Sequence, residues 1–86
     1  MKINNLIEKI KKKIFGKIQC EKIYIEDKTF LHKKHKNFDP KKFHLKIKIK
    51  SVELKSMEKI KANRYVFTIL GKELKNEIHS IQLFID

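Results

Sequence analysis

The chain has 86 residues, enough for one domain with one modest core, because folding at this length buries only about 60–65% of the unfolded surface. Its formal net charge is +12, which favours acidic partners. An apolar fraction of 41%, without long runs of Ser, Pro or Gly, excludes a mostly disordered chain.

Lysine supplies 21 of the 22 basic residues, and isoleucine occurs 14 times. An AT-rich coding sequence produces this composition whatever the function, so the charge alone does not indicate nucleic-acid binding. Cys20 is the single cysteine, which excludes an internal disulfide and a Cys-x-x-Cys motif. Because no segment approaches membrane-spanning length and the N-terminus lacks a signal-peptide pattern, we expect a cytoplasmic protein.

Residues 2–15 predict an amphipathic helix that Gly16 ends. Lysines occupy its polar side. Such a helix can lie on a membrane, but so small a domain needs the apolar face for its core. The residues expected to pack inward are Ile3, Leu6, Ile7, Ile10 and Ile14.

Residues 18–26 predict a strand whose apolar phase slips between Cys20 and Ile23, which indicates a bulge or a late start. Residues 27–42 form the longest irregular stretch and are expected to be an exposed loop. In it, His32 and His35 have the spacing of two ligands on one helical turn. Neighbouring lysines repel a cation, so by themselves the two histidines favour solvation over a zinc site.

Residues 43–50 show the clearest alternation, which predicts a strand with one buried and one basic face. Phe43, Leu45, Ile47 and Ile49 form the buried set, and the basic set is His44, Lys46, Lys48 and Lys50. Alternating lysine is normal on a solvated sheet face. Only Tyr24 is expected to join it as an aromatic, which is too few for a base-stacking platform.

A turn and a short helical piece around residues 57–62 are expected next, and then the main second helix over 64–75, with Asn63 as N-cap. Its predicted inward residues are Val66, Phe67, Leu70 and Leu74. Arg64 is the only arginine, and its planar guanidinium suits either a partner contact or a chance surface position.

The last predicted strand contains His79. If this strand alternates, His79 shares a face with Ile81, Leu83 and Ile85, and is either a satisfied structural histidine or a metal ligand. The order helix, strand, strand, short helix, helix, strand predicts an α+β sandwich. Its three-stranded sheet is expected to be covered by helices on one face.

From Ile7 to Leu83 the residues resemble the BolA family. Asp27-Lys28-Thr29 and then His32 resemble its Asp-Glu-Ser segment and loop histidine, and His44-Leu45 resembles its His-Phe pair. Ile78-His79-Ser80-Ile81 is similar to its Val-His-Ala-Leu. The helix from Arg64 to Leu74 resembles its Arg-x-Val-Tyr…Leu…Glu-Leu pattern, with Ala62-Asn63-Arg64 standing in place of an Arg-His-Arg run.

The resemblance implies one domain over residues 1–86 with a KH-like, type II-like αββααβ sandwich and a three-stranded mixed sheet. It also implies a non-catalytic adaptor that pairs with a monothiol glutaredoxin and shares a [2Fe–2S] cluster with it and glutathione. This chain's ligands would be His79 and His32, with His35 as the alternative. Partner contacts would involve Arg64, Asn63 and Tyr65; alone, the protein would be a cofactor-free monomer or weak homodimer.

A DNA-binding regulator of stress response and cell morphology is the alternative function. Its candidate residues are Lys46, Lys48, Lys50, Lys59 and Lys61. The Gly-x-x-Gly loop that KH domains bring to nucleic acid is missing. We expect no enzyme, because no Ser/His/Asp set, paired carboxylates or phosphate loop occurs.

Overall fold

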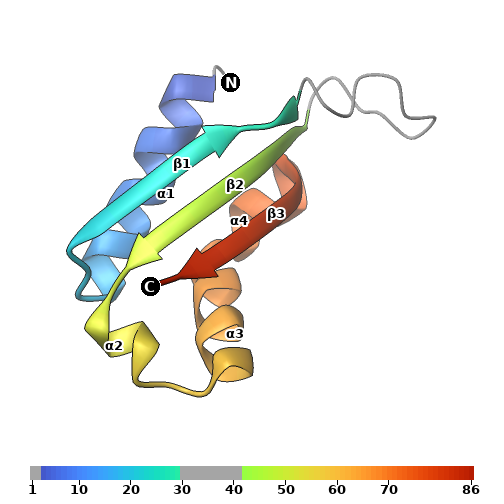
Figure 1. Ribbon diagram of the computed structural model, residues 1–86. Helices are drawn as coiled ribbons and strands as arrows, with labels where there is room; N and C mark the ends of the chain where they lie inside the picture. Colours follow the sequence, from blue (N-terminus) through green and yellow to red (C-terminus); the bar gives the residue numbers. More distant parts are fainter. Residues whose placement is uncertain (1–2, 30–41) are drawn as a thin grey trace.

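The computed structural model describes residues 3–29 and 42–86 (Figure 1). The helices and strands, in chain order, are α1 (Ile3–Lys17), β1 (Lys22–Asp27), β2 (Phe43–Lys50), α2 (Val52–Lys55), α3 (Lys59–Ile69), α4 (Gly71–Asn76) and β3 (Ile78–Ile85). None of the described helices is long and apolar enough to cross a membrane.

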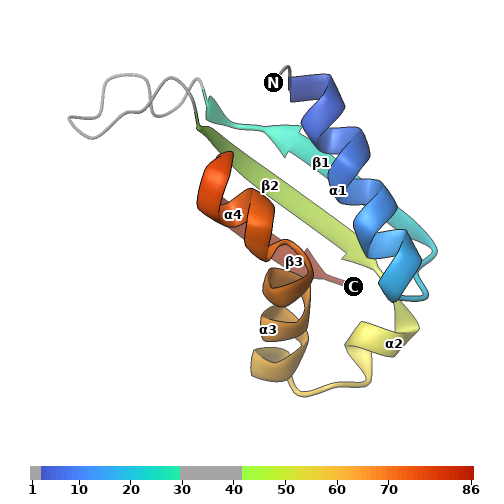
Figure 2. The same ribbon diagram turned by 180° about the vertical axis from the view of Figure 1, so that it is seen from behind.

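The three strands form one mixed sheet, as predicted, and their order in it is β1-β2-β3. β1 and β2 run antiparallel, whereas β2 and β3 run parallel. A parallel pair needs a crossover, and α2, α3 and α4 provide it. Helices α1, α3 and α4 lie behind the sheet in Figure 1 and in front of it in Figure 2, so they cover one face. We call the other side the open face.

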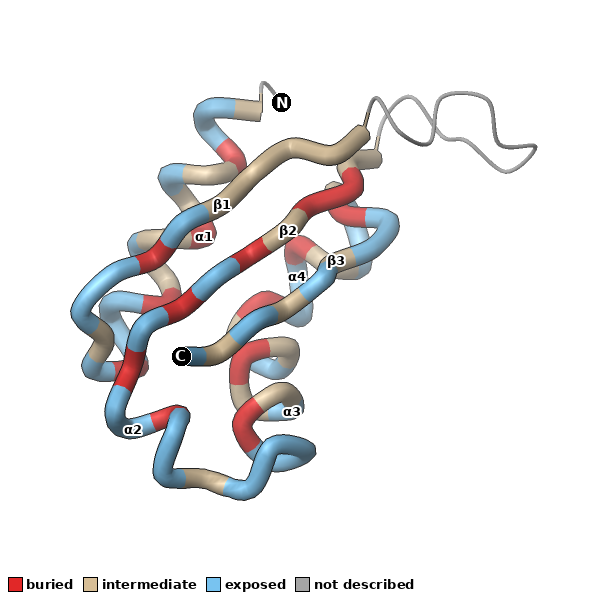
Figure 3. Tube along the Cα trace, in the orientation of Figure 1, coloured by how far each residue is buried: buried red, intermediate tan, exposed pale blue. Residues whose placement is uncertain are grey.

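The core lies between the covered face and these helices, and Figure 3 shows buried positions recurring along β2. Alternation in the strands and helical spacing in α1, α3 and α4 bring aliphatic side chains to one layer. The fully or nearly fully buried core residues include Leu6, Ile10, Ile14, Leu45, Ile47, Ile49, Ala62, Val66 and Leu70. The alternation predicted for 43–50 is therefore confirmed over Leu45–Ile49.

The predicted strand ends need small corrections, and the helix ends need larger ones. β1 begins late, at Lys22, which is one of the two predicted outcomes. Gly16 does not end α1, because the helix continues to Lys17 and no described glycine has a positive φ.

The predicted helix over 64–75 is wrong at its start and in its continuity. α3 begins at Lys59, five residues earlier, because Ala62 already occupies the buried phase that Val66 and Leu70 continue. Asn63 is not an N-cap; it lies inside α3, where its side-chain amide donates to the Lys59 carbonyl at 2.7 Å. Leu70 separates α3 from α4, which starts at Gly71.

A short helix, α2, precedes α3 and has a regular cap. The Ser51 hydroxyl accepts a hydrogen bond from Leu54 N at 3.2 Å and donates one to the Gln19 carbonyl at 2.7 Å. Ser51 is fully buried, so these two bonds satisfy a hydroxyl that would otherwise be costly there.

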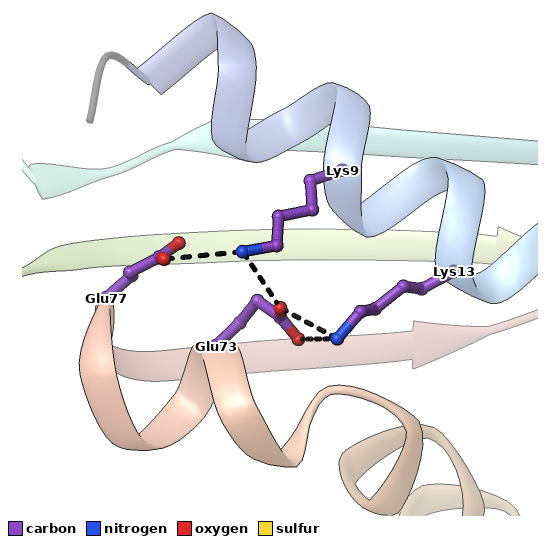
Figure 4. A network of polar contacts seen from close by, with 4 residues as sticks. All are labelled: Lys9, Lys13, Glu73 and Glu77. Atoms are coloured by element: carbon purple, nitrogen blue, oxygen red, sulfur yellow. Dashed lines mark hydrogen bonds and ion pairs between the residues drawn. The ribbon is translucent and has the colours of Figure 1, made fainter.

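Charged side chains join α1 to α4 (Figure 4). Glu73 is fully buried, and Lys13 Nζ donates to both of its carboxylate oxygens, at 2.7 and 2.8 Å. Lys9 Nζ lies 3.3 Å from Glu73 Oε2 and 3.5 Å from Glu77 Oε1. Burial by itself would raise the pKa of Glu73, but the hydrogen bonds from both lysines lower it below its ordinary value.

Candidate functional site

His79 is an extra residue in β3. Phe43 pairs with Ile78 and His44 with Ser80, so one step along β2 corresponds to two along β3. This irregularity lets both Ile78 and Ile81 turn toward the core, and it turns His79 out to solvent. The prediction that His79 shares a face with Ile81, Leu83 and Ile85 is therefore wrong, because it assumed unbroken alternation.

His44 supports His79 from β2. The two imidazole rings stack with centroids 4.7 Å apart and planes inclined by 25°. His44 Nδ1 lies 2.7 Å from the Ser80 hydroxyl, within hydrogen-bond distance. His44 was predicted on a solvated face, but it is only 7% exposed, because neighbouring groups cover it. It therefore restricts the orientation of the exposed ring.

The described residues that flank segment 30–41 lie at this same end of the sheet. Thr29 accepts a hydrogen bond from His44 N at 3.2 Å through its hydroxyl, and Lys28 N donates to the His44 carbonyl at 2.7 Å. Asp27 Oδ1 accepts from Thr29 N at 2.9 Å, which fixes the turn after β1. On the other flank, Phe43 N donates to the Glu77 carbonyl at 3.0 Å. His32 and His35 lie outside the described residues.

The described residues around His79 do not form a complete set of metal ligands. Within residues 3–29 and 42–86, no three His, Cys, Asp or Glu side chains gather as metal ligands. The lone pairs of imidazole lie in the ring plane, so two nearly parallel stacked rings do not converge on one ion. His79 therefore fits a single ligand position with His44 as its support. Burial raises the pKa of the Cys20 thiol, which disfavours the thiolate.

The structure does not bring the predicted partner-binding residues to His79. Asn63, Arg64 and Tyr65 lie on α3, whereas His79 is at the start of β3, where α4 ends (Figures 1 and 2). Arg64 is exposed. The Tyr65 hydroxyl donates a hydrogen bond to the Lys17 carbonyl at 3.2 Å, so this side chain also joins α3 to the end of α1.

The predicted nucleic-acid lysines divide between two sides of the sheet. Lys46, Lys48 and Lys50 project from the open face, whereas Lys59 and Lys61 belong to α3, which lies on the covered face. They do not form one surface.

A mixed three-stranded sheet with helices on one face, whose parallel strands are joined by a helical crossover, defines an α+β protein of KH-like topology. Residues 14–85 match the family model described as BolA-like protein, and the chain belongs to this family. The resemblance drawn from the sequence is thereby confirmed. No curated protein sequence matches significantly.

Two solved structures share the fold. BolA1 from Arabidopsis thaliana is 22% identical with a TM-score of 0.75, covering 92% of this chain and 87% of that one. The BolA domain of SufE1 from Arabidopsis thaliana is 20% identical with a TM-score of 0.79, covering 100% of this chain and 93% of that one. At these identities the similarity establishes the fold.

Proposed function

We propose that this protein is a non-catalytic adaptor that pairs with a monothiol glutaredoxin and shares a [2Fe–2S] cluster with it in iron–sulfur handling. The observation that carries the proposal is the placement of His79. An irregularity in β3 turns this imidazole outward, and the stacked ring of His44 restricts it. Membership of the BolA-like family supports the same reading.

The ligand chemistry fits a shared cluster better than a resident one. Imidazole is a good ligand for iron, and histidine in place of cysteine raises a cluster's reduction potential. Two histidines from one chain cannot hold a cluster alone, so a partner must supply thiolates. When bound, the cluster would supply electron-transfer or transferable iron–sulfur chemistry, while this chain's residues bind and orient it.

His32 is the proposed second ligand, and His35 is the alternative. Thr29 is anchored to His44, and three residues of chain span at most about 11 Å. The covalent chain therefore permits His32 to approach His79. For His35, six residues permit a longer reach, so the length of the chain admits either histidine as the second ligand.

On α3, we propose that Arg64 contacts the partner through its exposed guanidinium, with Asn63 and Tyr65 beside it. This surface would determine docking, whereas His79 would determine ligation. The two roles can be separated because the residues lie on different elements.

The test is anaerobic reconstitution of the protein with a monothiol glutaredoxin, glutathione, iron and sulfide. Wild type should give a heterodimer by size-exclusion chromatography and a visible circular-dichroism spectrum unlike that of glutaredoxin alone. His79→Ala should remove this spectrum, while Gln82→Ala, an exposed neighbour on the same strand, should retain it. An unchanged spectrum for His79→Ala would refute the ligand assignment.

The second ligand can be assigned in the same assay. His32→Ala should alter the spectrum and His35→Ala should not. The reverse result would transfer the role to His35, and no effect of either would remove the loop from the ligand set.

A further inference from the structure

The open face carries an aromatic row that is separate from the histidine site. Tyr24 on β1 pairs with Lys48 on β2, and Lys48 pairs with Phe84 on β3. The two aromatic side chains are 48% and 47% exposed, although large apolar groups are usually covered. Since strands lie about 4.8 Å apart, two aromatic rings flank one lysine across about 10 Å.

Cations surround these rings. Lys46 Nζ lies 5.4 Å from the centroid of the Phe84 ring. A hollow of about 370 Å³ on the same face is lined by Tyr24 together with Lys22, Lys48, Lys50 and Asp86.

The carboxylates near these lysines are those of Asp86, Glu26 and Glu21, and the last two offset little of the charge. Glu26, which pairs with Lys46 across the strands, is already neutralised by Lys28, whose Nζ lies 2.6 Å away. Lys50 lies 3.6 Å from Glu21, but both side chains are largely exposed, so this ion pair is weak. The face therefore combines positive charge with exposed aromatic surface.

We infer that the open face binds single-stranded nucleic acid, with bases stacking on Tyr24 and Phe84 and phosphates contacting Lys46, Lys48 and Lys50. Lysines attract any polyanion, but the aromatic rings select one with accessible base faces. In a duplex those faces are already stacked on one another, so a duplex can offer only its phosphates. Binding here requires neither a cluster nor a glutaredoxin, and it needs no Gly-x-x-Gly loop.

The measurement is fluorescence anisotropy with a labelled twelve-nucleotide oligothymidylate and a labelled twelve-base-pair duplex, both at physiological salt. The single strand should bind more tightly than the duplex. Tyr24→Leu and Phe84→Leu should each weaken single-strand binding about fivefold or more, because each removes a stacking surface. Phe15→Leu is the matched control, since Phe15 is an equally exposed aromatic on α1 and should leave affinity unchanged.

A salt titration tests the lysines. Lys48→Gln should reduce the slope of log affinity against log salt by about one, the loss of one phosphate contact. Lys61→Gln, which removes the same charge from α3, should leave the slope unchanged. Equal binding of duplex and single strand, together with unchanged affinity of both leucine variants, would show a general polyanion surface and overturn the inference.

Discussion

Two polar clusters of this small protein contrast in how completely their groups are satisfied. Around Glu73, a buried carboxylate receives hydrogen bonds from two lysines and is closed off from solvent. Around His79, one ring is held by stacking on His44 but is itself exposed. The first arrangement joins helices, whereas the second leaves an imidazole ring accessible from solvent. The exposure of an ionisable side chain after its internal bonds are made therefore distinguishes these two clusters better than its charge does.

The largest effect on stability is expected when the closed cluster loses its centre. Glu73→Ala should lower the free energy of unfolding by about 2–3 kcal/mol, because charge-assisted hydrogen bonds and packing are both lost. Urea denaturation followed by circular dichroism measures this. Glu58→Ala is the control, because Glu58 is exposed and should cost less than about 0.5 kcal/mol. Equal costs would mean that the α1–α4 ion pairs contribute nothing.

The next test breaks the stack beneath His79. In the reconstituted complex, His44→Ala should shift or weaken the visible circular-dichroism spectrum, because the His79 ring loses the surface that orients it. His44→Phe keeps an aromatic ring there and should restore most of the signal. If both variants lose the spectrum equally, the bond between His44 and Ser80, and not the stack, is what matters.

Acid should weaken the cluster around Glu73. The pKa of Glu73 is lowered in the folded state, so the unfolded chain binds a proton more readily. The resulting stability is fully present above the ordinary glutamate pKa, about 4.3, and is lost as pH falls through the lower folded value. Denaturation from pH 7 to pH 3 should show this loss in wild type. A Glu73→Gln variant with the same slope over that interval would contradict it.

The smallest effect distinguishes the two lysines. Lys13 makes the shorter, two-oxygen contact, whereas Lys9 lies farther from its carboxylates. We expect Lys13→Met to cost about 1 kcal/mol and Lys9→Met about 0.5 kcal/mol or less, since both side chains are partly solvated. Thermal denaturation at low and high salt compares them, and a larger cost for Lys9→Met would reverse this ranking.

Strand and face assignments could be predicted because they depend on local alternation. Alternation allows only one face of this strand to be apolar, the face of Leu45, Ile47 and Ile49, and all three are buried in the structure. The position of His79 could not be predicted in this way, because the extra residue in β3 is defined only against its partner strand. A slip of one residue reverses which side chains face out.

Other features depend on contacts that are distant in the sequence. Glu73 reads as an ordinary surface glutamate, since its lysine partner Lys13 lies 60 residues away. The alternation of β3 places Phe84 on the open face. Only the pairing of Lys48 with both Phe84 and Tyr24 shows that the two aromatic residues lie in one row. The earlier start of α3 could have been detected from Ala62, whose small side chain continues the buried phase.

The bonds between α1 and α4 also constrain how the chain folds during synthesis. Lys9 and Lys13 emerge from the ribosome early, whereas Glu77 and Glu73 follow 68 and 60 residues later. β2 likewise waits for β3 to complete its parallel pair. Contacts of such high sequence separation slow folding, and they leave Lys9 and Lys13 without their carboxylate partners, and β2 with an unpaired edge, until the last part of the chain is made. Nascent chains stopped before residue 73 should therefore require chaperone protection.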